Sequence, residues 1–210
     1  MFAASLLSPL DAATEHAMPL RAVPIQGAFE PLDAPGRRLL AARDGIYVEA
    51  CSEALYIRVR CVAMHTPYGE TSEALTLRGP RIPKALARNL MERSLAAHPR
   101  EMAALIVADA ADPSGYRLIE PEATGFVGRV TYADHGYDEA RLVIDAHSHG
   151  PYPARFSGVD DESDRSRCGP HVSMVFGHCI DRPSTKVAVR VCVGHYLIPL
   201  SDDLWTELFA

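Results

Sequence analysis

Residues 102–109, MAALIVAD, form an apolar run that limits the fold of this chain more than any other segment. A continuous apolar run of this length is typical of a buried strand. The turn residues DPSG follow at 112–115, and residues 116–121 have the composition of a return strand. The pattern predicts a hairpin whose first strand is buried.

A helix is predicted immediately before this hairpin, over residues 82–97. Ile82, Leu86 and Leu90 fall on one helical face of that segment. Pro83 lies in the expected first turn, where its missing N–H does no harm.

Further strands are predicted towards the C-terminus, and a short helix ends the chain. The expected strands are 126–132, 140–150, 171–180 and 186–198, and the helix is 201–210. Helices and strands in this order predict an α+β fold.

The N-terminal part, residues 1–74, has a different sequence pattern from the rest of the chain. Residues 1–44 carry five prolines without sustained periodicity, so we expect a loop-rich arm. Residues 45–50 and 54–62 alternate apolar and polar positions as a β-hairpin does. We therefore expect an extension over residues 1–74, available for docking a partner, and a main domain over residues 75–210.

Composition narrows the functional classes. The net charge of −6 supplies no general attraction for phosphate backbones, so we expect no nucleic-acid partner. No apolar run approaches the ~18–20 residues of a membrane span, so we expect no membrane partner. Five cysteines without a CxxC pair suit reduced thiols, which predicts a cytoplasmic protein.

The pattern His147-x-His149, seven residues, Ser157, two residues and Asp160 carries the chemistry. On a strand, residues i and i+2 point to the same side about 6.7 Å apart, so two imidazoles can converge on one ion. A carboxylate from the following loop supplies a third ligand and leaves a fourth position for water, as catalytic zinc sites do. Chance predicts an HxH about 0.4 times in such a chain, but the whole pattern on the order of 0.002 times.

This pattern resembles the JAMM (JAB, or MPN-plus) zinc metallopeptidase family over roughly residues 75–200. The form HSHGPYPARFSGVDDESDR resembles the prokaryotic branch called PRTRC system protein A, which is encoded beside a ubiquitin-activating-like adenylating protein. The resemblance implies a cytidine-deaminase-like mixed β-sheet flanked by helices. It also implies Zn²⁺ held by His147, His149 and Asp160.

The activity implied by the resemblance is amide or isopeptide hydrolysis of a ubiquitin-like or sulfur-carrier-like conjugate. The family's catalytic glutamate falls on Glu101, which would act as general base towards a zinc-activated water. Its position between the predicted helix and strand fits the family better than Glu92, Glu120 or Glu122. Ser157 takes the family's oxyanion-stabilising role. Three departures from the family's common residues, at Gly150, Ala104 and Asp145-Ala146, remove no ligand.

Other interpretations of these residues stay open. Ser157 and Asp160 can form an N-terminal capping box, and Asp161 is a neighbouring acid that offers the same ligand atom. Cys168, His171, His178 and Cys179 lack a recognised zinc spacing, and an exposed strand face is the simpler reading of Tyr56, Arg58 and Arg60.

Other functions are weighed against hydrolysis. The first is a catalytically idle interaction module of the same fold. IDAHSHG also resembles the DxHxH strand of amidohydrolases, but only 60 residues follow Gly150, too few for that barrel. Nucleobase deaminases need a CxxC that this chain lacks. Two histidines and a carboxylate also suit a non-haem iron oxygenase.

Overall fold

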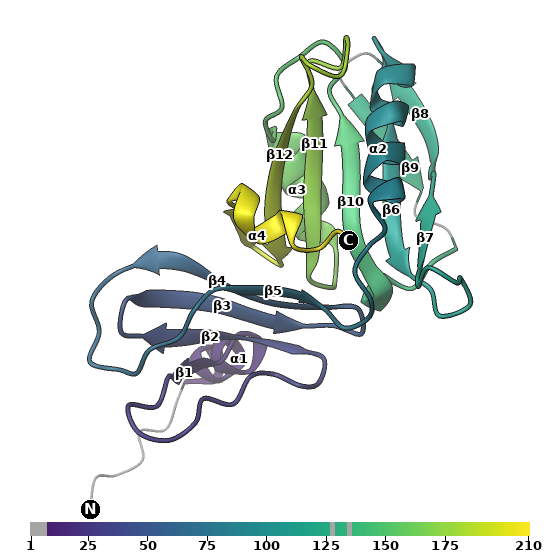
Figure 1. The fold of residues 1–210 in the computed structure, drawn as a ribbon. Helices are drawn as coiled ribbons and strands as arrows, with labels where there is room; N and C mark the ends of the chain where they lie inside the picture. Colours follow the sequence, from purple (N-terminus) through teal and green to yellow (C-terminus); the bar gives the residue numbers. More distant parts are fainter. Residues whose placement is uncertain (1–7, 127–128, 134–135) are drawn as a thin grey trace, which may run out of the picture.

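The computed structural model describes residues 8–126, 129–133 and 136–210. Within these residues the strands form a five-stranded, a six-stranded and a two-stranded sheet, accompanied by helices (Figure 1). The predicted α+β class is confirmed. No described helix is long and apolar enough to cross a membrane.

The five-stranded sheet is built from the N-terminal third of the chain, in the order β1-β2-β3-β4-β5. Strand β1 runs parallel to β2, and the other neighbours are antiparallel. The predicted hairpin is confirmed as the β3–β4 pair. The elements are α1 (Pro9–Ala17), β1 (Leu20–Ala22), β2 (Gly36–Ala42), β3 (Gly45–Cys51), β4 (Leu55–Ala63) and β5 (Ala74–Leu77).

The expectation of a loop-rich arm over residues 1–44 is wrong for much of its length. Helix α1 begins at the N-cap Ser8 with Pro9 in its first turn, and β2 buries Leu40 in the sheet. The strand pattern of β2 was not recognised because two adjacent charged residues, Arg37 and Arg38, are typical of a surface loop. In the structure Arg37 Nε donates a hydrogen bond to Ala17 O, and Arg38 forms an ion pair with the buried Glu49 of β3.

Strand β5 belongs to this first sheet. Residues 55–58 of β4 pair with residues 74–77, so the sheet extends three residues beyond the limit of 74 expected for the extension. The division of the chain into separate domains stays a prediction.

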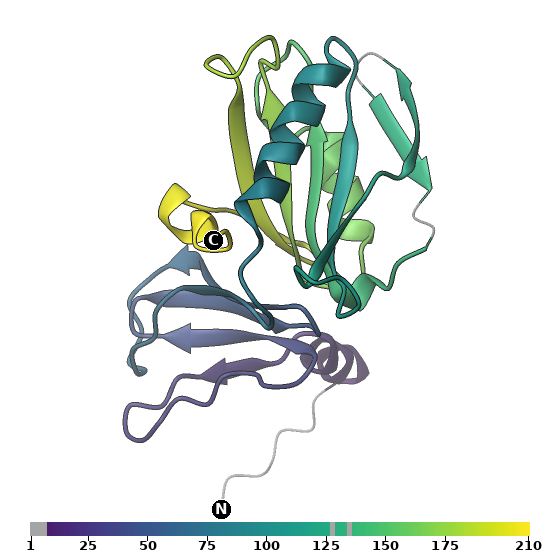
Figure 2. The ribbon, with the colours of Figure 1, turned by 45° about the vertical axis from the view of Figure 1, so that its right-hand side comes forward.

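The six-stranded sheet has the order β13-β12-β11-β10-β6-β7. Only β10 and β11 are parallel, and α3 lies in the connection between them. Helix α2 covers one face and α3 the other (Figures 1 and 2). The elements are α2 (Lys84–Ala97), β6 (Ala103–Ala108), β7 (Tyr116–Ile119), β10 (Leu142–Ser148), α3 (Gly158–Ser166), β11 (His171–Gly177), β12 (Lys186–Val193), β13 (Tyr196–Pro199) and α4 (Asp202–Thr206).

Between β7 and β10 a separate hairpin pairs β8 (Glu122–Phe126) with β9 (Arg129–Ala133), followed by the 3₁₀ turn η1 (Glu139–Arg141). The strand expected at 126–132 therefore falls on parts of both strands, and its residues 127–128 lie outside the described residues.

Three predicted boundaries need correction, and the first is the helix expected at 201–210, which spans only Asp202–Thr206. Helix α2 begins at Lys84 with Pro83 as its N-cap, because Ile82 instead pairs with the C-terminal segment through its N–H to Leu208 O at 2.8 Å. The strand expected at 186–198 is a hairpin of β12 and β13. Gly194, with φ of +57°, opens the two-residue loop between them, a backbone position that favours glycine.

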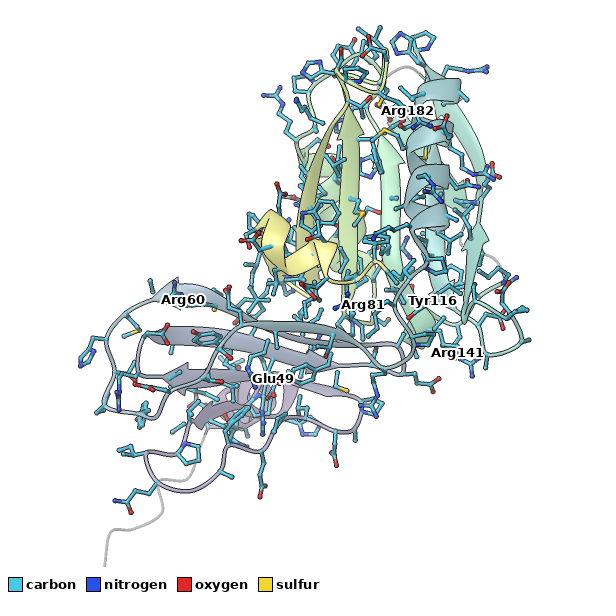
Figure 3. All side chains as sticks on the ribbon, viewed as in Figure 1. Glu49, Arg60, Arg81, Tyr116, Arg141 and Arg182 are labelled. Atoms are coloured by element: carbon cyan, nitrogen blue, oxygen red, sulfur yellow. The ribbon has the colours of Figure 1, made fainter. Side chains whose placement is uncertain are left out.

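The two large sheets share one hydrophobic core. Ile57 and Leu75 of the first sheet belong to the same buried cluster as Ile144 and Val191 of the second. The first sheet meets the second where β10 begins, because Arg141 pairs with Glu53 at 3.2 Å. Figure 3 shows Arg141 and Tyr116 at this junction and Arg182 at the far end of the second sheet. Strand β10 runs from the junction towards that far end (Figure 1).

Candidate metal centre

His147 and His149 lie at the far end of β10 and point to the same side of it, as the alternation of a strand requires. Their Nε2 atoms are 3.2 Å apart. Both side chains are mostly buried, with 13% and 14% exposed. Two imidazole nitrogens therefore converge on one point at the C-terminal end of β10, an inner strand of the sheet.

Asp160 reaches the same point from the first turn of α3. Its Oδ1 lies 3.1 Å from His147 Nε2, and its Oδ2 lies 3.5 Å from His149 Nε2. The backbone N–H of Ser157 donates to Asp160 Oδ2 at 2.6 Å, which orients the carboxylate. The structure thus brings together the three residues that the sequence pattern predicts as ligands.

The donor atoms fit a tetrahedral zinc ion. Zinc bonds of 2.0–2.1 Å at the tetrahedral angle place neighbouring ligand atoms about 3.3 Å apart. His147 Nε2 lies 3.2 Å from His149 Nε2 and 3.1 Å from Asp160 Oδ1, and His149 Nε2 lies 3.5 Å from the other carboxylate oxygen, Oδ2. One ligand atom from each of the three residues lies within 4.8 Å of the other two, so the set is compatible with a metal ion and leaves a fourth position for another ligand.

Charge also favours a cation at this point. Burial alone would raise the pKa of Asp160, but hydrogen bonds to His147 and His149 outweigh it and hold that pKa well below its usual range. Burial lowers the pKa of His147, but the hydrogen bond to Asp160 together with the negative charges of Asp160, Asp145 and Asp164 outweighs it, so the net shift is upward. The ionised carboxylate of Asp160 therefore favours a positive charge, on His147 or on a bound cation, at this point.

Glu101 lies in the connection between α2 and β6. His147 pairs with Ala103 across the β10–β6 ladder, so the same antiparallel register extended by two residues places Glu101 opposite His149. Burial raises the pKa of Glu101, the charges of His149 and His147 lower it, and the net shift is upward. A carboxyl group that holds a proton this readily is suited to proton transfer.

The alternatives to Glu101 are engaged elsewhere. Glu92 pairs with Arg182, and Glu120 pairs with Arg93. The side chain of Glu122 lies outside the described ones.

Gly150 explains one departure from the family pattern. Its φ is +52°, and a Cβ at this position would lie 2.4 Å from the carbonyl oxygen of Pro99. Proline, the residue common in the family, fixes φ near −65° and is incompatible with this backbone. The loop after the histidines therefore packs directly on the turn that carries Glu101.

Ser157 is the N-cap of α3 and forms a complete capping box with Asp160. Its Oγ accepts the N–H of Asp160 at 3.3 Å. Because the hydroxyl acts as an acceptor in this box, its proton remains available for a second partner. Ser157 is exposed. The capping interpretation is confirmed, and the catalytic one stays a prediction.

Sequence reasoning missed a second group of possible ligand atoms, on Asp164, His171 and Cys192. All three side chains are buried, and Cys192 Sγ lies 3.2 Å from Asp164 Oδ2. That oxygen also accepts two bonds from Arg190. These residues come from α3, β11 and β12, and their spacing in the sequence gave no motif. Among the described residues, no group of possible ligands combines Cys168, His178 and Cys179.

The family model of the prokaryotic homologs of the JAB domain matches residues 83–191, just over half of the 210 residues. The chain belongs to this family. The JAB-matching region contains Glu101, the two histidines, Ser157 and Asp160.

A domain of unknown function, DUF2016, matches residues 8–78, which cover the five-stranded sheet. Comparison with curated proteins gave no significant match. The family match shows JAB-family membership, and the structure shows a set of donor atoms compatible with a metal ion. The roles of the individual site residues stay predictions.

Proposed function

We propose that this JAB-family chain is a zinc metallopeptidase that hydrolyses amide or isopeptide bonds. The observation that supports the proposal best is the convergence of His147 Nε2, His149 Nε2 and the Asp160 carboxylate, with nearest contacts of 3.1 to 3.5 Å. This donor set suits zinc, and the β10–β6 register, extended by two residues beyond His147, puts Glu101 opposite His149.

His147, His149 and Asp160 would hold the metal. Zinc bound there would polarise the scissile carbonyl and lower the pKa of a water molecule. Glu101, as general base, takes a proton from the attacking water and then, as general acid, gives it to the leaving amine. Its raised pKa makes the carboxylate a stronger base towards the attacking water.

Ser157 supplies the hydrogen bond that the reaction needs at the carbonyl oxygen. Its hydroxyl oxygen is fixed by the N–H of Asp160, so the hydroxyl proton can be donated to the oxygen on which charge develops. Capping and catalysis therefore use different parts of one hydroxyl group.

The proposed substrate is a ubiquitin-like or sulfur-carrier-like protein joined to an amine, and the proposed partner is a ubiquitin-activating-like adenylating protein. The substrate proposal rests on the resemblance to the JAMM family, whereas the partner and placement in the PRTRC system protein A branch rest on the form of the HSHGPYPARFSGVDDESDR segment. Placement in the cytoplasm rests on the five cysteines without a CxxC pair. The N-terminal sheet is a candidate docking surface for such a partner.

The test combines metal analysis with cleavage assays. Purified chain should hold about one zinc ion, and it should release an amine from a ubiquitin-like protein in a reaction that a chelator stops and added Zn²⁺ restores. Purified protein that does not bind Zn²⁺ at neutral pH would overturn both the proposed metal site and the mechanism. Zinc-loaded protein that cleaves no conjugate would favour an interaction module of the same fold. Iron dependence with oxygen uptake would favour an oxygenase.

A further inference from the structure

The side chain of Arg190, on β12, joins three residues of the segment that carries Ser157 and Asp160. Its Nε and Nη2 donate to Asp164 Oδ2 at 2.8 and 2.6 Å. Its Nη1 donates to Asp161 Oδ1 at 2.5 Å. Arg190 is only 5% exposed, so this planar fork is shielded from water and its hydrogen bonds are strong.

The face of the same guanidinium packs on Phe156, with 3.8 Å from its carbon to the ring centroid. Phe156 immediately precedes Ser157, whereas Asp161 immediately follows Asp160. Arg190 therefore contacts the chain on both sides of the segment 157–160.

That segment has little packing of its own. Ser157, Gly158 and Val159 are exposed, so burial of their side chains does not fix its place. His147 lies on β10 and His149 directly after it, and β11 separates that strand from β12. The contacts of Arg190 thus fix Asp160 relative to the sheet that carries the other two donors.

The carboxylate of Asp164 is ionised in this arrangement. Burial opposes ionisation, but the hydrogen bond and charge of His171 and the charge of Arg190 outweigh it and lower the pKa of Asp164 to about 2. Arg190 already supplies the positive charge that the group of Asp164, His171 and Cys192 needs. We therefore read that group as an anchor for α3 and not as a second metal site.

We propose that Arg190 is a positioning residue that holds Ser157 and Asp160 in the geometry that metal binding requires. This inference rests on the proposed zinc site. The side chain of Arg190 contacts Asp161, Asp164 and Phe156, so its effect on the ligands passes through α3 and through the loop that ends at Phe156.

The sign of one effect separates positioning from simple electrostatics. Removing a cation near a site for a divalent cation should tighten metal binding, because the repulsion between the two positive charges is lost. If Arg190 positions Asp160, its removal should weaken metal binding instead. The two explanations therefore predict opposite changes.

The experiment measures Zn²⁺ affinity by competition with a chromogenic chelator in wild type and three variants. Arg190→Met should weaken Zn²⁺ affinity roughly 10- to 100-fold, as loss of outer-shell partners does in metal sites. Arg190→Lys should recover part of the loss, because an ammonium group can pair with Asp164 but lacks the fork and the flat face. Arg182→Met removes an exposed cation that pairs with Glu92, and it should leave the affinity unchanged.

A second pair of variants covers the case in which Arg190→Met does not fold. Asp161→Asn removes the negative charge from one contact of Arg190 and leaves the buried Asp164 pair intact. It should weaken Zn²⁺ binding roughly 3- to 10-fold, less than loss of the whole network. Glu162→Gln removes an equal charge one residue further on, where the side chain is exposed, and should have a smaller effect.

The outcomes are distinct. Wild type that does not bind Zn²⁺ overturns the proposed function. Wild type that binds, with a folded Arg190→Met variant that binds equally or more tightly, overturns the inference alone. An Asp161→Asn variant indistinguishable from Glu162→Gln would overturn it too.

Discussion

Ser148 and Met102 hold each other through two hydrogen bonds. The Met102 N–H donates to Ser148 Oγ at 3.0 Å, and the Ser148 N–H donates to Met102 O at 3.0 Å. Ser148 stands between the two histidines, and Met102 follows Glu101. The residue between two candidate ligands thus fixes the chain next to the candidate base.

Ser148→Ala should lower kcat more than it lowers Zn²⁺ affinity. The change leaves the buried Met102 N–H without its partner, which costs about 1–3 kcal/mol and loosens the placement of Glu101. The backbone bond from Ser148 N–H remains and keeps the histidines in register. Steady-state kinetics and chelator competition measure the two effects. Ser148→Thr keeps a hydroxyl group and should retain more activity, whereas equal kcat in Ser148→Ala and wild type would contradict the prediction.

Glu101→Gln should lower kcat by about 10²- to 10⁴-fold with zinc content retained, since general acid–base groups contribute that much. Burial raises the pKa of Glu101, so the folded chain binds a proton more readily than the unfolded chain, and above that pKa the ionised carboxylate destabilises the fold. The metal-free variant should therefore be at least as stable as wild type at pH 7 in thermal unfolding. Glu120→Gln, which changes an exposed acid paired with Arg93, is the control.

Ser157→Ala should remove both functions of its hydroxyl. Loss of the cap costs about 0.5–2 kcal/mol of stability, and loss of the oxyanion donor lowers kcat by about 10²- to 10³-fold. Ser157→Asp keeps a capping acceptor but has no proton to donate at neutral pH. It should recover stability in denaturant unfolding without recovering kcat; recovery of both would show that the serine acts only as a cap.

Gly150→Ala should destabilise the protein and weaken Zn²⁺ binding. The positive φ disfavours any Cβ by more than about 1 kcal/mol, and this Cβ would also collide with Pro99 O. Gly158→Ala is a matched control, because a Cβ there meets no atom within 4 Å. Thermal unfolding of the two variants should differ clearly, and equal melting temperatures would refute the packing argument.

Asp164→Asn should remove a source of acid sensitivity. The pKa of Asp164 is lowered from 3.8 to about 2, so its ionisation stabilises the fold above pH ~4, and this stability is lost as the pH falls towards 2. The shift corresponds to about 2 kcal/mol. Wild type should lose stability between pH 4 and 2 more steeply than the variant, which should already be weaker at pH 7. Parallel curves in urea unfolding at several pH values would contradict this.

The sequence predicted the parts of the fold whose patterns are local. The apolar run that became β6 and the alternation of β3 and β4 are visible without tertiary information. Strand β2 was missed because adjacent arginines are usually exposed to solvent. Their partners, Glu49 for Arg38 and the end of α1 for Arg37, are visible only in the tertiary structure. The β12–β13 turn was missed because a single glycine inside an apolar run carries little signal.

The donor triad could be predicted because its members lie within fourteen residues and follow the geometry of one strand and one helix start. The network around Arg190 could not. Arg190, Asp164 and His171 lie on β12, α3 and β11, and only the order of strands in the sheet brings them together.

The first sheet meets the second where β10 begins, whereas the candidate ligands lie where β10 ends. A protein bound by the DUF2016 region would therefore leave the candidate ligands uncovered. If the proposed function holds, binding there would raise the local concentration of a conjugate near the site without blocking it. On that proposal, the arrangement suits an enzyme that binds its target at the first sheet and cleaves it at the opposite end of the second.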